Sequence, residues 1–183
     1  LREQDWTRIT LNCLRPDATA LRYLPAGLAD GRCKVRQERE DVCPGVDLPG
    51  DWEAYLALLS KKDRHELRRK LRRLGQGGQA RSYVLVDGEI GPREVDDFLA
   101  LLRLSSPEKA AFMDERMETF FRGIFAAFAH DGLLRLYLLE LDGKRVATAL
   151  CFDWRGELLL YNSGYDPAYA QLSVGLLLKA FCV

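Results

Sequence analysis

Three successive segments near the C-terminal end of the chain alternate apolar and polar residues. They span residues 133–141, 145–153 and 157–165. Alternation with a period of two is typical of strands that bury one face. Asp142-Gly143 lies between the first two segments and Arg155-Gly156 between the second two, and a pair ending in glycine favours a tight hairpin turn. The pattern therefore predicts an antiparallel meander of three strands.

Apolar residues at three- and four-residue steps predict helices on both sides of this meander. The predicted helices cover residues 17–31, 51–59, 61–74, 92–104 and 107–132, and a last helix opens at Ser173. Ser60, followed three residues later by Asp63, favours a capped start for the third helix, and Ser106-Pro107 does the same for the fifth. Within the fifth helix we expect a buried aromatic stripe formed by Phe120, Phe121, Phe125 and Phe128.

The rest of the chain predicts further strands and one boundary between domains. Strand-like alternation covers residues 6–14, 32–38 and 81–87. Residues 41–50 contain two prolines and two glycines, a composition typical of a loop or linker. The helical pattern that opens at Ser173 continues to Val183 without a capping residue, so we expect the domain to continue beyond this end.

Composition and charge exclude several classes of protein. The 183 residues are 48% hydrophobic and 30% charged, which is ordinary for a folded globular protein. The formal net charge is zero, so the chain lacks the basic field of a dedicated nucleic-acid binder. No apolar run reaches the roughly 20 residues that cross a membrane. The five cysteines form no C-x-x-C pair and only two histidines accompany them, so we expect a reduced, cytoplasmic protein without a metal site.

Positive charge is concentrated in the helix predicted over residues 61–74. This segment contains eight Lys/Arg and two acidic residues, a local charge of +6 in a chain whose net charge is zero. Leu67, Leu71 and Leu74 form a narrow apolar stripe that would dock the helix. One interpretation is a surface for phosphate, nucleotide, tRNA or a lipid head group, formed by Arg64, Arg68, Arg69 and Arg72. The other is a solvated helix paired with the protein's own acidic residues.

The loop from Gln171 to Gly175 has the features of a second anion site. It joins the last predicted strand to the helix that opens at Ser173. The first turn of a helix leaves backbone N–H groups unpaired, and the helix dipole favours negative charge there. A diphosphate group fits such a start, and Gly175 has no side chain to obstruct its approach. The alternative is a serine that simply caps a buried helix.

From residue 81 onward the predicted order is strand, helix, helix, strand, strand, strand, helix. This order, with the basic helix before it, the hairpin LELDGKRVATALCFD and the segment YNSGYDPAYAQLS, resembles the GNAT-type acyltransferases of the bacterial branch that includes the CelD-like and Fem-type transferases. The resemblance implies an α/β fold of the α+β kind, with a mixed, mostly antiparallel sheet flanked by helices and C-terminally incomplete. Residues 1–49 would be the remnant of a preceding GNAT-like half, and residues 50–183 a second GNAT-like domain truncated after its central helix.

The resemblance also implies a reaction, the transfer of an acyl group from acyl-CoA to an amine or hydroxyl. Acetyl-CoA is the first candidate donor, and the acceptor would be a small molecule or a cell-envelope precursor. Glu157 or Tyr161 would take part in catalysis, with a base accepting the proton of the amine. Of the fingerprint Arg/Gln-x-x-Gly-x-Gly/Ala, only the final glycine is present, as Gly175. The residues that would bind acyl-CoA are Asn162, Ser163, Gly164, Gln171, Leu172, Ser173, Val174 and Gly175.

Two alternatives stay open. A Fem-type enzyme would use aminoacyl-tRNA as the donor to extend a cell-wall peptide, and the basic helix would then contact the tRNA. A degenerate GNAT-like module would act without catalysis, as a scaffold or anion-binding domain, and the incomplete fingerprint favours this reading.

Overall fold

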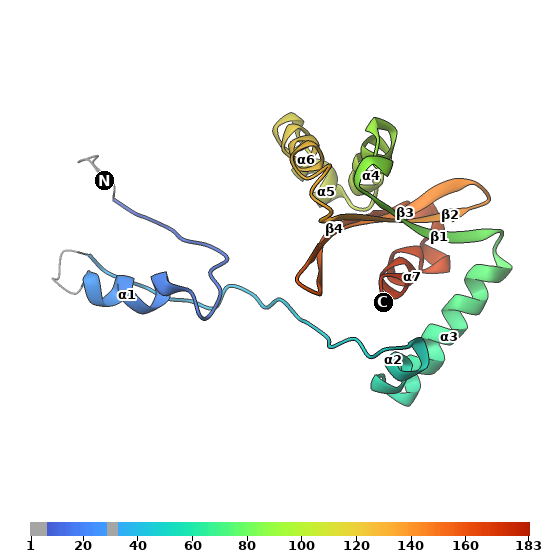
Figure 1. Ribbon diagram of the computed structural model, residues 1–183, viewed down its shortest axis with the longest axis horizontal. Helices are drawn as coiled ribbons and strands as arrows, with labels where there is room; N and C mark the ends of the chain where they lie inside the picture. The colour runs from blue at the N-terminus through green and yellow to red at the C-terminus, as the bar shows by residue number, and fades with distance from the viewer. Residues whose placement is uncertain (1–6, 29–32) are drawn as a thin grey trace. The chain divides into compact units, whose positions relative to one another are not determined.

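The computed structural model describes residues 7–28 and 33–183. Residues 48–183 form one compact unit, which contains a four-stranded antiparallel sheet (Figure 1). The strands are β1 (Ala80–Val86), β2 (Leu134–Leu141), β3 (Lys144–Trp154) and β4 (Glu157–Tyr165), in that spatial order. Asp142-Gly143 and Arg155-Gly156 have positive φ at both residues, as type I′ hairpin turns require. The predicted meander is confirmed.

Helices cover both faces of this sheet (Figure 1). One face carries α4 (Pro92–Leu104), α5 (Pro107–Phe112) and α6 (Glu115–Ala127). The other carries α2 (Trp52–Leu58), α3 (Lys61–Gln76) and α7 (Val174–Phe181). Two short 3-10 helices, η1 (Asp87–Glu89) and η2 (Pro167–Leu172), follow β1 and β4. The predicted fold class, an α/β arrangement with a mostly antiparallel sheet between helices, is confirmed.

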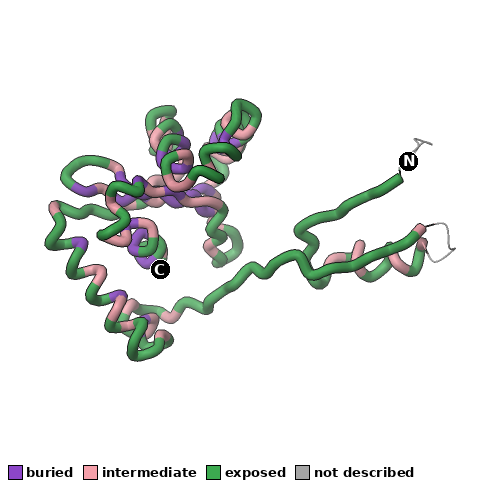
Figure 2. The backbone as a smooth tube through the Cα atoms, turned by 180° about the vertical axis from the view of Figure 1, so that it is seen from behind, coloured by how far each residue is buried: buried purple, intermediate pink, exposed green. Residues whose placement is uncertain are grey.

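Each face of the sheet has its own hydrophobic core, and Figure 2 shows the buried residues gathered in the strands and the adjoining helices. On the side of α4 and α6, Phe98 and Phe121 pack against the strands. On the side of α3 and α7, Leu74 and Leu177 do so. Burying one such side chain contributes about 1.5–3 kcal/mol, so both sets of helices are held firmly on the sheet.

The single helix predicted over residues 107–132 is wrong, because the chain forms α5 and α6 instead. Met113 leaves helical geometry (φ −84, ψ 57) and is buried, and the Asp114 carboxylate accepts the Met117 N–H at 2.8 Å. An aspartate that caps the next helix favours a new start over continuation. The aromatic stripe is narrower than predicted, since Phe120 is 48% exposed whereas Phe121 is buried.

Residues 1–47 form a separate compact unit whose described part contains one helix, α1 (Thr19–Gly27). The strands predicted over residues 6–14 and 32–38 are wrong for their described residues, which form no strand. Trp6 and Arg32 lie outside the described residues. A strand needs a partner for its hydrogen bonds and a core for its apolar face, and the described part of the chain supplies neither, leaving Ile9 56% exposed.

The outer strand β4 is shaped by a bulge and by one glycine. Asn162 pairs with Leu150 while Leu160 pairs with Cys151, so Tyr161 is the extra residue of a β-bulge, which bends a strand and re-aims its side chains. A Cβ on Gly164 would lie 2.6 Å from the backbone of Leu101 in α4. The backbones of α4 and β4 are therefore in direct contact at Gly164.

One largely buried arginine ties α4 to the sheet. Arg145 on β3 donates to Asp97 Oδ2 at 2.6 Å, Glu94 Oε1 at 2.9 Å and Tyr83 Oη at 3.1 Å. Burial opposes both charges, because it lowers the pKa of Arg145 and raises that of Glu94. The hydrogen bonds outweigh it, so the pKa of Arg145 lies above its ordinary value and the pKa of Glu94 lies below its own.

Replacing Gly164 with alanine should lower the free energy of unfolding by about 1–3 kcal/mol, because the added methyl group meets backbone atoms that cannot rotate away. Urea denaturation measures this change. Gly123→Ala is the matched control, since its Cβ meets nothing within 4 Å in the middle of α6, and it should stabilise the protein by about 0.4–1 kcal/mol. Equal effects of the two substitutions would contradict the close contact between α4 and β4.

Stability should decrease in acid partly because of Glu94. Its folded pKa lies below its unfolded value, so its contribution is present above the unfolded pKa and is lost as pH falls through the folded pKa. Arg145→Met should lower the unfolding free energy at pH 7 by about 3 kcal/mol, because it leaves partly buried carboxylates without their positively charged partner. It should also flatten the loss of stability between pH 7 and pH 3 in urea titrations. An unchanged pH profile would contradict the arrangement.

Candidate functional site

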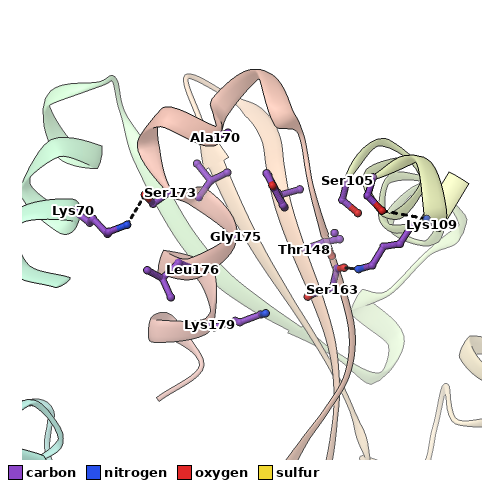
Figure 3. Close-up of a pocket in the computed structure, with 14 residues that line it drawn as sticks. Lys70, Ser105, Lys109, Thr148, Ser163, Ala170, Ser173, Gly175, Leu176 and Lys179 are labelled. Atoms are coloured by element: carbon purple, nitrogen blue, oxygen red, sulfur yellow. Dashed lines mark hydrogen bonds between the residues drawn. The ribbon is translucent and has the colours of Figure 1, made fainter. Parts of the chain in front are cut away.

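A cavity of about 430 Å³ opens where the end of β4 meets the start of α7 and the junction of α4 with α5 (Figure 3). It lies within residues 48–183 and draws its walls from both faces of the sheet. None of its described lining residues is acidic. They are Lys70, Ser105, Ser106, Lys109, Thr148, Ser163, Gly164, Tyr165, Ala170, Ser173, Val174, Gly175, Leu176 and Lys179.

Ser173 joins η2 to α7 in the left-handed conformation, with φ 58 and ψ 33. This conformation costs a residue other than glycine on the order of 1–2 kcal/mol. The Ser173 carbonyl accepts the N–H groups of Leu176 and Leu177 at 3.1 and 2.9 Å, and no described residue accepts those of Val174 and Gly175. Val174 is buried and Gly175 is partly buried, and amides left without an acceptor at a helix start beside a left-handed residue attract anions.

Tyr165 and Gly175 bring β4 and α7 together at this cavity. A Cβ on Gly175 would lie 3.0 Å from Cδ1 of the Tyr165 ring, so a larger residue would push the helix start away from the strand. The sequence suggested that glycine here leaves room for a ligand. The structure adds a packing reason, because glycine lets the first turn of α7 rest on an aromatic ring.

Three lysines from three different helices point at the cavity (Figure 3). Lys70 of α3 donates to Ser173 Oγ at 3.1 Å and lies 3.6 Å from Glu66 Oε1. Lys109 of α5 and Lys179 of α7 form no ion pair with any described residue. Because none of the described lining residues is acidic, the cavity carries a positive field that suits an anionic ligand.

Lys109 contacts the outer edge of β4, the edge that does not pair with β3. Its Nζ donates to Asn162 Oδ1 at 3.3 Å and to the Ser163 carbonyl oxygen. The Ser163 N–H donates to Asn162 Oδ1 at 2.9 Å, so both backbone groups of Ser163 face away from β3. Burial lowers the pKa of Lys109, and the positive charge of Lys179 lowers it further.

Thr148 of β3 adds an unsatisfied polar group to the inner wall. Thr148 is fully buried, and its Oγ1 has no hydrogen-bond partner among the residues that the structure describes. A buried hydroxyl without a partner typically costs about 1–3 kcal/mol. Such a group in the wall of a cavity is therefore a candidate contact for a ligand.

A family model described as acetyltransferase (GNAT) domain matches residues 61–183, more than half of the chain. The chain belongs to the GNAT acetyltransferase family. A comparison with curated proteins finds no match. The matched residues include the whole sheet, α3 to α7 and every residue that lines the cavity. Among the described residues, no cluster of His, Cys, Asp and Glu could hold a metal ion, and no helix has the length and apolarity to cross a membrane.

The GNAT domain brings together most of the residues predicted to bind acyl-CoA. Five of them line the cavity, namely Ser163, Gly164, Ser173, Val174 and Gly175. Asn162 lies just outside and holds Lys109 in place. Gln171 is exposed on η2, whereas Leu172 packs into the core beside Gly77. These two residues do not line the cavity.

The two residues predicted to take part in catalysis lie elsewhere on β4. Glu157 is exposed at the start of the strand, opposite Trp154. The Tyr161 ring packs against those of Phe121 and Phe152, with centroids 6.0 and 5.6 Å away. Neither residue lines the cavity, so a substrate would have to extend along β4 to reach them.

The four arginines predicted to bind an anion are spread around α3. Arg68 pairs with Glu53 at 2.6 Å and Arg69 with Glu66 at 2.7 Å. Arg64 donates to the Leu59 carbonyl at 3.3 Å, and Arg72 is exposed. None of them lines the cavity of the GNAT domain, where α3 contributes Lys70 instead.

Sequence reasoning missed the three lysines, although two of them carried a signal. Lys70 stands three residues after Leu67 and four before Leu74, so it shares the docked side of its helix. Lys179 lies four residues after Gly175, on the same side of α7. Lys109 carried no such signal, because its partners lie 53 and 54 residues away in the chain.

The left-handed conformation of Ser173 can be tested by comparing two substitutions. Both Ser173→Ala and Ser173→Gly remove the contact with Lys70, but only glycine relieves the backbone strain. Ser173→Ala should therefore lower the free energy of unfolding by about 1 kcal/mol more than Ser173→Gly. Urea denaturation of the two variants measures the difference, and equal stabilities would contradict a strained backbone at this position.

Proposed function

We propose that this chain transfers an acyl group from acyl-CoA to an amine or hydroxyl, as a member of the CelD-like and Fem-type branch of the GNAT family. Acetyl is the first candidate acyl group, and a small molecule or cell-envelope precursor is the candidate acceptor. The proposal rests on one observation above the others. The cavity joins the free amides of α7 to three lysines, and none of its described lining residues is acidic.

The start of α7 suits the diphosphate of coenzyme A. The N–H groups of Val174 and Gly175 would donate to its oxygens, and Lys70 beside Ser173 would add a cation. Charge-assisted hydrogen bonds of this kind contribute roughly 1.5–3 kcal/mol each. From there the ligand would run along the open edge of β4 toward Ser163.

The reaction needs no covalent intermediate on the protein. The acceptor nitrogen or oxygen would attack the thioester carbon, the C–S bond would break, and the thiolate would leave to take up a proton. The Ser163 N–H faces the open edge of β4 and donates to Asn162 Oδ1. If the thioester carbonyl oxygen replaced this acceptor, the N–H would stabilise the negative charge that develops on that oxygen. Glu157 or Tyr161 stays a candidate to accept the proton of the acceptor, directly or through water.

The exposed cations of α3 support a second candidate for the acyl donor, aminoacyl-tRNA. Its ion pairs among described residues involve Arg68, Arg69 and Lys70. Four further exposed cations, Lys61, Lys62, Arg72 and Arg73, have no such pair. This surface favours a polyanion such as the aminoacyl-tRNA of a Fem-type enzyme.

The non-catalytic alternative, an anion-binding scaffold, rests on the incomplete fingerprint. The assignment of residues 1–49 to a preceding GNAT-like half and residues 50–183 to a second, truncated domain also stays a proposal.

Isothermal titration calorimetry with coenzyme A, acetyl-CoA and aminoacyl-tRNA tests the donor. Coenzyme A should bind at low salt and more weakly as salt rises, because charge dominates recognition. Lys70→Met should weaken its binding by about tenfold or more. Arg116→Met on the exposed start of α6 removes one charge away from the cavity and should leave affinity unchanged. Binding of aminoacyl-tRNA without binding of coenzyme A would support the Fem-type alternative. Binding of neither ligand would support the non-catalytic scaffold.

A further inference from the structure

Two of the three lysines that line the cavity, Lys109 and Lys179, stand apart from the diphosphate position. Lys70 and the amides of Val174 and Gly175 lie together at the start of α7. Lys109 lies instead at Ser163 on the edge of β4, where the proposed function places the acyl end of the ligand. Figure 3 shows Lys179 extending from α7 toward the strands, while Lys109 reaches Ser163 from α5.

No described residue neutralises the charges of Lys109 and Lys179. Lys109 donates to an amide oxygen of Asn162 and to a backbone carbonyl, which are both uncharged. Neither Lys109 nor Lys179 has a carboxylate partner among the described residues. Two ammonium groups that line one cavity repel each other, and burial adds to this cost for Lys109, whereas Lys179 is exposed. Such an arrangement is relieved when an anion lies between the two groups.

The remaining hydrogen-bonding capacity suits a small planar anion. An ammonium has three donors, and Lys109 uses two of them on its neutral partners. One donor remains for a ligand oxygen, and Lys179 offers its own. Thr148 provides an additional, unpaired hydroxyl in the same wall. A carboxylate, with two oxygens and one charge, matches this set better than a neutral methyl or amide group.

We propose that Lys109 and Lys179 form a carboxylate-binding subsite at the acyl end of the cavity. This inference rests on the proposed function for the direction of the bound thioester. The carboxylate has two possible sources, which share this chemistry. It belongs either to a dicarboxylic acyl group such as succinyl, or to an acceptor that is an amino acid with a free carboxylate.

Calorimetry with matched ligand pairs separates the two sources. Succinyl-CoA and butyryl-CoA have acyl chains of the same length and differ by a carboxylate in place of a methyl group. In a second arm, protein saturated with coenzyme A, which has no acyl group to transfer, is titrated with L-amino acids and with their amides. The carboxylate member should bind about tenfold more tightly in one of the two arms. Coenzyme A itself gives the baseline that reports on the proposed function alone.

Substitutions then assign the preference to the two lysines. Lys109→Met and Lys179→Met should each reduce the preference to near unity, and each should weaken the binding of coenzyme A itself much less than that of the carboxylate ligand. Lys109→Arg keeps the positive charge and should retain most of the preference for the carboxylate ligand. Arg116→Met is the control for the loss of a distant charge. Thermal unfolding of each variant verifies that it is folded, and the two lysine variants provide independent tests.

Three results would overturn the subsite. The native protein could bind coenzyme A yet show no preference in either arm. The preference could survive both methionine substitutions. The substitutions could also weaken coenzyme A as much as succinyl-CoA, which would assign both lysines to its phosphates. A native protein that binds no coenzyme A is a separate outcome, because it removes the proposed function together with the inference built on it.

Discussion

The contacts that β4 makes on its two faces at neighbouring residues fix the geometry of the whole site. Successive residues of a strand face opposite sides of the sheet. Gly164 therefore meets the backbone of α4, while Tyr165 meets Gly175 at the start of α7. Each contact depends on a glycine, because a side chain at either position would separate the elements. The two helices reach the edge strand at the same point, and the cavity lies there.

The electrostatics of the cavity follow from this packing rather than from the overall charge of the chain. Its lysines come from α3, α5 and α7, and no short stretch of sequence contains them all. Most cations of the basic helix are either paired with nearby carboxylates, Arg68 with Glu53 of α2 and Arg69 with Glu66 of the same helix, or directed to solvent. A local charge of +6 in α3 thus contributes a single cation, Lys70, to the cavity.

The sequence predicted elements whose causes are local. The I′ turn at Asp142-Gly143 and the cap of α3 at Ser60 depend on residues within one turn of each other, and both were predicted. The strand expected over residues 6–14 was wrong for its described residues, because alternation does not show whether a partner strand exists. Lys109 was missed because its contacts depend on how α5 lies against β4. The start of α7 was recognised from local chemistry, but the cations facing it required the fold.

The contacts of Ser173 with Lys70 and of Gly175 with Tyr165 explain how this chain departs from the GNAT fingerprint. Its first position, Arg or Gln, is Ala170 here, yet Lys70 places a cation beside Ser173 from a different helix. Its middle glycine is Ser173, which adopts a left-handed conformation that glycine would adopt without strain. The serine hydroxyl accepts the hydrogen bond of Lys70, and that contact offsets part of the strain. The retained glycine, Gly175, is the one whose replacement would separate α7 from Tyr165. We therefore infer that α3 supplies the charge that the loop itself lacks, and that docking of the basic helix through Leu67 and Leu74 is a requirement of the site.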